Sequence, residues 1–344
     1  MIDDRNKTVL VTGGAGYIGS HCCKALARAG FEPVVYDNLS GGHREFVKWG
    51  PLIEGDVRDG AGLQAAIEQT QPIAVLHFAG LIVVSESVRD PGACWDINLN
   101  GTLRLLEAMQ RGGVGHLVFS STAAVYGEPN VDLIDERQPK EPVNPYGASK
   151  LAAEKIMEAY DVAHDLRSVR LRYFNAAGAD PDVEIGEAHQ PETHLIPLVL
   201  DAALGRRERI SVYGDDYPTE DGTAIRDYIH VCDLAAAHVA ALEHLLGGGA
   251  SAAINLGTGS GASVAEVIAR CRAVTGKVIS AEPFPRRAGD PPRLVADPRL
   301  AQSLLRWTPE RSDLDTIIGD AWAWHKRRFF RPMAMPGEQN GLAS

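Results

Sequence analysis

Tyr146 and Lys150 stand four residues apart in the segment Tyr-Gly-Ala-Ser-Lys, which begins a predicted helix. Residues at i and i+4 share one face of a helix, so the phenol and the ammonium group are predicted to point the same way. A phenol titrates near pH ~10 in water, and a fixed positive charge nearby favours its phenolate. The pair therefore suits proton removal from a substrate hydroxyl, although this spacing taken alone favours an ordinary amphipathic helix.

A glycine-rich turn follows the first predicted strand. Residues 8–11 are apolar and β-branched, as is typical of a strand buried on both faces of a parallel sheet. Gly13, Gly16 and Gly19 come next and lead into a predicted helix at 20–29. This spacing permits a tight turn, a close approach of the backbone to a pyrophosphate, and close packing of the helix on the strand. The turn therefore predicts a dinucleotide site.

An acidic residue supports the same interpretation. The next predicted strand, at 33–36, is followed by Asp37, which lies 18 positions after Gly19. A separation of about 20 residues is expected for the carboxylate that binds the 2'-hydroxyl of the adenosine ribose. Because a carboxylate repels a 2'-phosphate, we predict NAD rather than NADP as the cofactor.

Strands and helices alternate through the first half of the chain. Further strands are predicted at 51–54, 73–78, 116–121 and 168–174, and helices at 60–69, near 91–111 and from 146 to about 165. Such alternation predicts an α/β fold with a doubly wound parallel Rossmann sheet, whose ligand lies at the carboxyl ends of the strands. The residues at those ends, with one from the helix near 91–111, are Asp56, Val57, Phe78, Ala79, Gly80, Ser120, Ser121, Thr122 and Asn98.

The regular alternation fades after residue 180, which predicts a second, smaller α/β domain. We expect the NAD-binding domain at 1–175, with later segments at about 225–260 returning to it, and the second domain mainly at 176–331. A polar tail at 332–344 is predicted to be disordered. In the second domain Arg286 and Arg287 stand beside a turn, where their guanidinium groups suit either phosphate binding or a solvated loop.

Composition narrows the classes of partner. The 344-residue chain has a formal net charge of -11 and no Lys/Arg-rich block, which argues against nucleic acid or an anionic membrane and favours a small molecule. The five cysteines are scattered, without a C-x-x-C pair or histidines at metal-ligand spacing, so we expect reduced thiols and no metal. No apolar run approaches the roughly 20 residues of a membrane span, and the start is polar; we therefore predict a cytoplasmic protein.

Four motifs together resemble the extended short-chain dehydrogenase/reductase family. They are the turn at 12–19, the triplet at 120–122, the Tyr-Gly-Ala-Ser-Lys segment at 146–150, and Arg-Tyr-Phe-Asn at 172–175. Within that family, the segment at 216–223 running into 226–231 resembles the long signature of UDP-glucose (UDP-galactose) 4-epimerases, which is far more specific than a glycine triplet.

The resemblance implies a reaction and assigns a role to each motif. Tyr146 is implied as the base and acid at the sugar O4, Lys150 as the group that tunes it and holds the nicotinamide ribose, and Thr122 as a hydrogen-bond partner of the same hydroxyl. The C4 hydride passes to NAD and returns to the other face of a 4-keto sugar, so no net redox occurs. The second domain is then the UDP-sugar-binding domain, and the protein is expected to be a homodimer.

The same resemblance implies two sets of binding residues. Those for NAD are Gly13, Gly16, Tyr17, Ile18, Gly19, Asp37, Asn38, Asp56, Val57, Phe78, Ala79, Gly80, Asn98, Tyr146, Lys150 and Phe174. Those for the UDP-sugar are Thr122, Tyr146, Asn175, His194, Leu195, Tyr213, Arg226, Arg287, Asp290 and Leu294. Ile82 stands where the family often has a lysine near the nicotinamide, and Leu294 stands where it often has a bulky aromatic residue beside the sugar.

Several alternatives stay open at the level of sequence. A 4,6-dehydratase is disfavoured because the acid and base expected after the Ser/Thr are replaced by Ala123 and Ala124. A simple alcohol dehydrogenase would form net reduced cofactor, and a non-catalytic NAD sensor would not need the Tyr146 and Lys150 pair. The native sugar can be a UDP-hexose, a UDP-N-acetylhexosamine, or a UDP-pentose such as UDP-xylose or UDP-arabinose.

Overall fold

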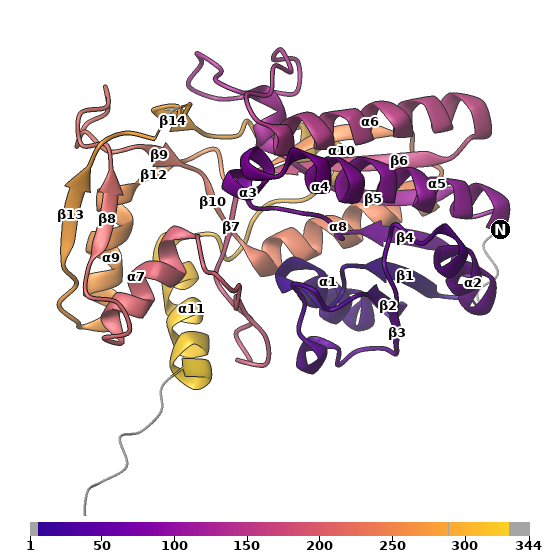
Figure 1. Ribbon diagram of the computed structural model, residues 1–344, viewed down its shortest axis with the longest axis horizontal. Helices are drawn as coiled ribbons and strands as arrows, with labels where there is room; N and C mark the ends of the chain where they lie inside the picture. Colours follow the sequence, from indigo (N-terminus) through magenta and orange to yellow (C-terminus); the bar gives the residue numbers. More distant parts are fainter. Residues whose placement is uncertain (1–5, 288, 330–344) are drawn as a thin grey trace, which may run out of the picture.

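Seven parallel strands form the centre of the computed structural model, which describes residues 6–287 and 289–329 (Figure 1). The predicted tail at 332–344 lies outside the described residues. The order β11-β6-β5-β4-β1-β2-β3 contains the 3-2-1-4-5-6 order of a doubly wound sheet, with β11 added beside β6, which confirms the predicted fold class. The strands are β1 (Thr8–Thr12), β2 (Glu32–Asp37), β3 (Leu52–Glu54), β4 (Ala74–His77), β5 (His116–Thr122), β6 (Arg167–Tyr173) and β11 (Ala252–Leu256).

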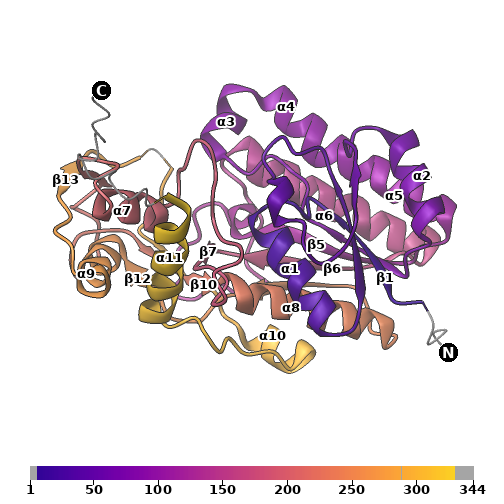
Figure 2. The same cartoon turned by 90° about the horizontal axis from the view of Figure 1, so that it is seen from below.

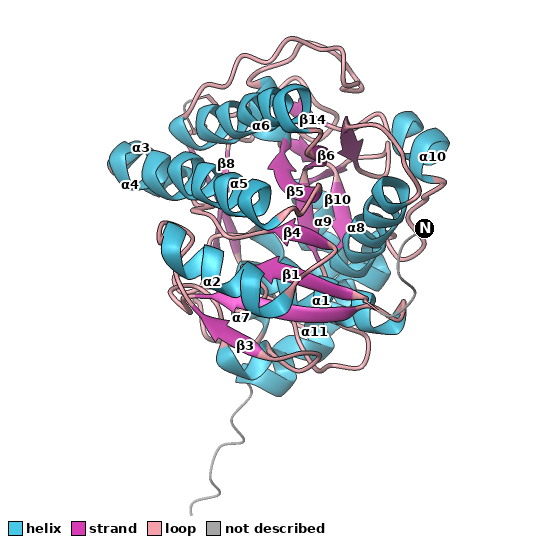
Figure 3. Cartoon of the chain, turned by 90° about the vertical axis from the view of Figure 1, so that its right-hand side faces the viewer, coloured by secondary structure: helices cyan, strands magenta, loops and turns pink. Residues whose placement is uncertain are grey.

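Helices cover both faces of this sheet (Figure 3). Side chains alternate across a strand, so Val9 and Val11 of β1 enter the core on one face while Leu10 enters the core on the other. The first face is covered by α1 (Tyr17–Arg28), α8 (Val231–Leu246) and α10 (Arg299–Leu305). The second is covered by α2 (Gly60–Thr70), α5 (Gly101–Gly112) and α6 (Pro145–His164).

The helix predicted near 91–111 is interrupted in the structure. After the short helices α3 (Val84–Arg89) and α4 (Pro91–Trp95), residues Asp96–Asn100 form a π-helical turn before α5 begins. Such wider turns occur frequently at functional sites. Here the turn contains Asn98, which is buried.

A second, smaller α/β unit has its own apolar core, as predicted, and lies beside the sheet (Figures 1 and 2). It contains α7 (Leu195–Ala203), α9 (Val264–Thr275) and α11 (Leu314–Phe329) with the paired strands β8 (Ile210–Tyr213) and β13 (Ala281–Phe284). Two further small sheets are built from very short strands. One contains β9 (Ile225–Arg226), β12 (Ala262–Ser263) and β14 (Arg293–Leu294), and the other pairs β7 (Asn175–Ala177) with β10 (Tyr228–His230). The domain boundaries themselves stay a prediction.

All five cysteines are free thiols, as expected, and all but Cys232 are buried. The Cys94 sulfur lies 3.5 Å from the Ser149 hydroxyl of α6. Over the described residues, none of the helices combines the length and apolar character needed to cross a bilayer.

Candidate active site

The start of α6 places Tyr146 in the first helical turn. Pro145 occupies the first helical position, where its missing N–H is not needed, and the Asn144 side chain accepts a hydrogen bond from the Gly147 N–H at 2.8 Å. The Tyr146 N–H donates to the Ser87 hydroxyl of α3 at 3.2 Å. These contacts hold the turn that presents the phenol, and Lys150 follows one turn later as predicted.

Lys150 lies on α6, and its almost completely buried side chain reaches the end of β5. Its Nζ donates to the Ser120 carbonyl at 3.0 Å and lies 4.7 Å from the centre of the Phe119 ring. Burial lowers the pKa of the ammonium group to about 8. The Ser120 bond is the single hydrogen bond of Nζ within the described part of the chain, so two further N–H donors fit a pair of ribose hydroxyls.

The pKa of the Tyr146 phenol is raised, whereas we expected a nearby positive charge to lower it. Burial raises the pKa of the phenol above its usual value, the Thr122 hydroxyl partly offsets this, and Cys94 adds to the rise. Lys150 does not contribute to this shift, so the predicted lowering by its charge is not seen and desolvation sets the direction. Thr122 itself ends β5, and its Oγ1 accepts from the Ala124 N–H at 3.1 Å, which fixes the hydroxyl beside the phenol.

Asn98 connects the loop after β4 with α6. Its Oδ1 accepts from the Leu81 N–H at 2.8 Å, and its Nδ2 donates to the Leu81 carbonyl and to the Ser149 hydroxyl, each at 3.0 Å. Ser149 in turn donates to the Tyr146 carbonyl at 2.8 Å. Both residues thus position the helical turn that contains Tyr146. Our sequence reasoning missed Ser149, although it lies inside the Tyr-Gly-Ala-Ser-Lys segment.

The glycine turn has the geometry that a pyrophosphate requires. Gly13 has φ +73°, and a Cβ there would lie 2.5 Å from the Ala79 nitrogen, while a Cβ at Gly19 would lie 2.2 Å from the Gly13 carbonyl oxygen. These two glycines let the turn pack against β4 and α1. At Gly16, by contrast, a Cβ would meet only the Gly13 oxygen, at 3.3 Å, so the backbone at the start of α1 is open to an anion.

The predicted adenosine-side residues gather at the ends of β2 and β3. Asp37 is buried, and its carboxylate accepts from the Ala15 N–H at 3.0 Å and the Leu39 N–H at 2.8 Å. Burial raises the pKa of Asp37, and these two bonds oppose the rise. Asn38 donates to Asp56 at 2.9 Å, and Asp56 also pairs with Arg58 at 2.7 Å, which lowers the pKa of that carboxyl group.

Four other residues predicted to bind NAD have side chains that serve packing. Val57 and Phe78 lie in or against the two sheet cores, and Ile18 of α1 packs against one of these cores. The buried Tyr17 hydroxyl donates to the Gly178 carbonyl at 2.7 Å. The Phe78 ring centre lies 4.8 Å from that of His238. Contacts from these positions to a cofactor would therefore come from the backbone.

Two predicted substrate residues pair with each other. Arg226 of β9 forms an ion pair with Asp290, and the Asp290 carbonyl accepts from the Tyr217 hydroxyl at 3.3 Å. The parallel pairing of β9 with β14 sets Leu294 opposite Arg226. Asp290 thus orients the Arg226 guanidinium, which is the kind of preorganised group that binds a diphosphate.

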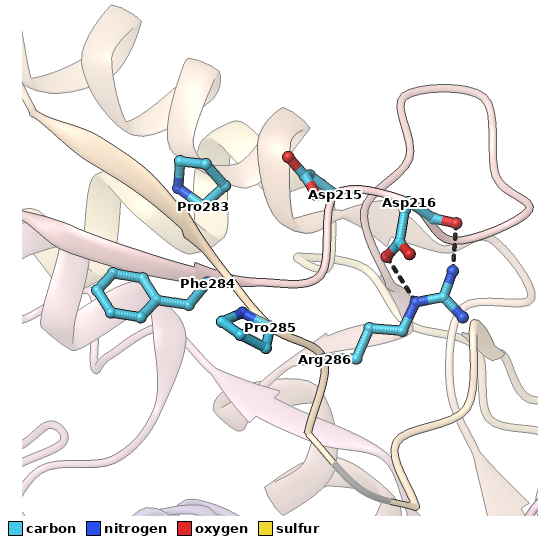
Figure 4. Close-up of a pocket in the computed structure, with 6 residues that line it drawn as sticks. All are labelled: Asp215, Asp216, Pro283, Phe284, Pro285 and Arg286. Atoms are coloured by element: carbon cyan, nitrogen blue, oxygen red, sulfur yellow. Dashed lines mark hydrogen bonds and ion pairs between the residues drawn. The ribbon is translucent and has the colours of Figure 1, made fainter.

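Arg286 and Arg287 have different roles in the structure. Arg286 donates to the Asp216 side chain at 2.6 Å and also to the Asp216 carbonyl (Figure 4), so it closes a loop at the edge of a shallow pocket. The pocket lining includes Arg286 but not Arg287, and consists of Asp215, Asp216, Pro283, Phe284, Pro285 and Arg286. Arg287 instead stacks on Tyr213, with its guanidinium carbon 4.1 Å from the ring centre.

The remaining predicted residues are Phe174 for NAD and Asn175, His194, Leu195 and Leu294 for the UDP-sugar. Phe174 and Leu294 pack against a small apolar cluster that includes Ala123, directly after Thr122. The Asn175 N–H donates to the Asp227 carbonyl at 3.0 Å, where β7 pairs with β10. His194 directly precedes α7, which begins at Leu195, and its Nδ1 contacts Glu187 instead of a backbone N–H of the helix.

Comparisons with known proteins agree with this arrangement. A model of the NAD dependent epimerase/dehydratase family matches residues 9–257. A UDP-glucose 4-epimerase of Rhizobium leguminosarum bv. trifolii is 54% identical over 321 residues, 93% of this chain and 98% of that protein. One from Rhizobium meliloti is 52% identical over 324 residues, 94% and 98% of the two chains. The solved UDP-glucose 4-epimerase from Brucella ovis, in complex with NAD, is 51% identical with a TM-score of 0.91, covering 92% of this chain and 98% of its own.

Proposed function

This chain belongs to the NAD dependent epimerase/dehydratase family, and from that premise we propose that it reversibly epimerises C4 of a UDP-hexose, converting UDP-galactose to UDP-glucose. The observation that carries the proposal is the grouping of Thr122, Tyr146 and Lys150 at the end of β5, close to Gly80 and the glycine turn. Ala123 and Ala124, directly after Thr122, offer no acid or base for elimination of water.

Tyr146 moves the proton in both halves of the reaction. Bound NAD would supply a reversible hydride acceptor for C4 and the positive charge of its oxidised ring. A positive charge in a desolvated site lowers the raised pKa of a phenol, so Tyr146 takes the O4 proton in the first half and returns it in the second. Thr122 hydrogen-bonds the same hydroxyl, and Lys150 holds the ribose.

The second unit binds the UDP part in this proposal. Arg226 and Arg287 supply positive charge for the diphosphate, and Asp290 and Tyr213 hold their guanidinium groups in place. Asn175, Leu195 and the backbone of His194 complete the UDP site, with Leu294 beside the sugar, while the His194 side chain contacts Glu187.

The activity is tested by incubating purified protein with UDP-galactose and separating the products by chromatography. UDP-glucose should appear up to an equilibrium mixture, without net formation of reduced cofactor. Net reduced cofactor would instead indicate an alcohol dehydrogenase, a lasting 4-keto-6-deoxy sugar would indicate a dehydratase, and no conversion would favour a sensor. A parallel panel of UDP-N-acetylhexosamines and UDP-pentoses identifies the native sugar.

Heat-denatured protein should release NAD, in either redox state, and no NADP. The Asp37 carboxylate, already held by two backbone N–H groups, would face a 2'-phosphate in a largely buried site, and this repulsion disfavours NADP. Mass spectrometry of the released nucleotide is the measurement. Asp37→Asn keeps the side-chain size but removes the charge, so it should reduce the preference for NAD. Release of NADP from the unaltered protein would refute the role of Asp37.

UDP-glucose should be a better substrate than UDP-N-acetylglucosamine, which we expect to turn over weakly. Leucine at 294 lacks the ring and hydroxyl of a tyrosine, and an apolar pocket discriminates by only about 1–3 kcal/mol per methylene-sized change. Leu294→Tyr should lower kcat/KM for the N-acetyl sugar more than for UDP-glucose, and Leu294→Ser should do the opposite. An unchanged ratio in both variants would mean that Leu294 does not line the sugar pocket.

We also propose that the protein is a cytoplasmic homodimer. Five free thiols suit a reducing compartment. Ile82, Val84, Val88 and Trp95, on and beside α3 and α4, are large apolar side chains with exposed surface, which favours a partner there. The mass of the protein in solution tests the second part of this proposal.

A further inference from the structure

Four metal-ligating side chains converge in the loop between β7 and α7. Glu187, His189, Glu192 and His194 each direct one ligand atom inward, and these atoms all lie within 4.8 Å of one another. His189 Nδ1 is 3.2 Å from Glu187 Oε1 and 3.7 Å from Glu192 Oε2. His194 Nδ1 contacts Glu187 Oε1 and lies 3.9 Å from Glu192 Oε1. All four therefore face a common centre.

We propose that this cluster binds one divalent first-row transition metal ion, with zinc as its natural occupant. Two imidazoles and two carboxylates form a four-ligand set that zinc accepts, with metal–ligand bonds of about 2.0–2.2 Å. Ligand atoms around a tetrahedral ion at that distance are about 3.3–3.6 Å apart. The separations of 3.2 and 3.7 Å from His189 Nδ1, and of 3.9 Å from His194 Nδ1 to Glu192, lie close to this range. The closer His194–Glu187 pair must move apart to admit an ion.

The charges of the cluster are also compatible with a bound divalent ion. The side chains of Glu187 and Glu192 are only 6% and 13% exposed, and within the described residues their charged partners are His189 and His194 alone. The neighbouring acidic group of Asp180, Asp182 and Glu184 instead receives the Lys24 ammonium at 2.7–2.8 Å. Glu187 is buried and Glu192 is half-buried, and neither has a lysine or arginine partner among the described residues. One divalent ion would balance the two carboxylates while both imidazoles stay neutral.

The surrounding structure holds the ligands in place. The N–H groups of Thr193 and His194 donate to Glu192 Oε1 at 2.8 and 2.9 Å, and the Trp324 indole donates to the Glu187 carbonyl at 3.0 Å. His43 Nε2 hydrogen-bonds the Ala188 carbonyl at 2.8 Å. Contacts of this kind fix ligand orientation around bound metals. The ion therefore has a structural role, in which it fastens the loop that leads into α7.

This site departs from our expectation that the chain binds no metal. That expectation came from the scattered cysteines and from the uneven spacing of His238 and His244, whereas the pattern Glu-x-His-x-x-Glu-x-His at 187–194 contains no cysteine. The loop has no helical or strand periodicity, so the sequence does not show that the four side chains turn toward one point.

Co²⁺ binding by tag-free protein with its cofactor in place tests the proposal. After treatment with a chelator and its removal by dialysis, the protein should bind one equivalent of Co²⁺ with the visible absorption of a tetrahedral ion, and one equivalent of Zn²⁺ should displace it. His189→Asn and Glu192→Gln should each weaken Co²⁺ binding by at least about 10-fold, because even loss of an outer partner costs about 10- to 100-fold. Glu192→Gln keeps the side-chain shape if His189→Asn folds poorly.

His244→Asn is the matched control, since His244 is a half-buried histidine that hydrogen-bonds the Ala250 carbonyl away from the cluster. It should bind Co²⁺ as the unaltered protein does. The proposal is overturned if the unaltered protein binds no stoichiometric Co²⁺, or if His189→Asn and Glu192→Gln bind it unchanged. A preference for Mg²⁺ or Ca²⁺ over Co²⁺ would also overturn it, because those ions select oxygen ligands.

Discussion

Tyr146→Phe is expected to lower kcat for the interconversion of UDP-galactose and UDP-glucose by about 10²- to 10⁴-fold, the usual effect of removing a general acid–base group. The substitution keeps the ring and the backbone bond to Ser87, so the start of α6 should not change. UDP-sugar affinity and thermal stability should therefore stay close to those of the unaltered protein. Chromatographic turnover assays, calorimetric binding of UDP and thermal denaturation measure the three quantities.

Tyr160→Phe is the matched control for this substitution. Tyr160 lies on the same helix and packs against His164, with ring centres 5.3 Å apart, toward the opposite end of α6 from Tyr146. Its loss of a hydroxyl should leave kcat unchanged. Full activity of the Tyr146→Phe protein would show that another group moves the O4 proton.

Glu154→Ala is expected to lower the free energy of unfolding by about 3–5 kcal/mol, because it leaves the buried Arg172 without a counter-charge. Glu154 of α6 and Arg172 of β6 have side chains only 1% and 5% exposed, and Arg172 Nε donates to Glu154 Oε1 at 2.9 Å. Glu154 also accepts from Ser121, the residue before Thr122, so the pair supports the strand end that carries the catalytic hydroxyl. Urea denaturation followed by circular dichroism measures the change.

Two comparison variants isolate the cause. Lys155→Ala removes the exposed ion pair with Glu158 on the same helix and should cost less than about 1 kcal/mol. The double variant Glu154→Leu with Arg172→Met removes both charges and should recover much of the lost stability. If Glu154→Ala costs no more than Lys155→Ala, or if the double variant is no more stable than Glu154→Ala, an uncompensated charge is not the cause.

Features set by neighbouring residues were predictable from the sequence. The apolar run at 8–11, the glycine spacing and the position of Asp37 predicted β1, the turn and the end of β2, because each depends on local chain geometry. Asn144 and Pro145 likewise determine where α6 begins, so the relation of Tyr146 to Lys150 was confirmed. The parallel sheet followed from the alternation of strands and helices.

Strands of two or three residues could not be predicted from the sequence. β7, β9, β10, β12 and β14 are too short for a period of two to appear, and they form because distant segments meet, as Leu294 meets Arg226. The π-helical turn at Asp96–Asn100 was missed for a related reason, since the sequence there continues a helical pattern. The bonds from Asn98 to Leu81 and Ser149 show the contacts that this turn serves.

The sequence by itself determined the reacting groups, because a phenol, an ammonium group and a hydroxyl keep their chemistry wherever they lie. Only the tertiary structure decided their environment. Lys150 donates to Ser120, 30 residues away in the chain, and desolvation rather than Lys150 dominates the pKa of Tyr146. Arg286 closes a loop through Asp216, 70 residues away, while Arg287 stacks on Tyr213. Burial and long-range pairing arise from packing, which the local periodicity of a sequence does not encode.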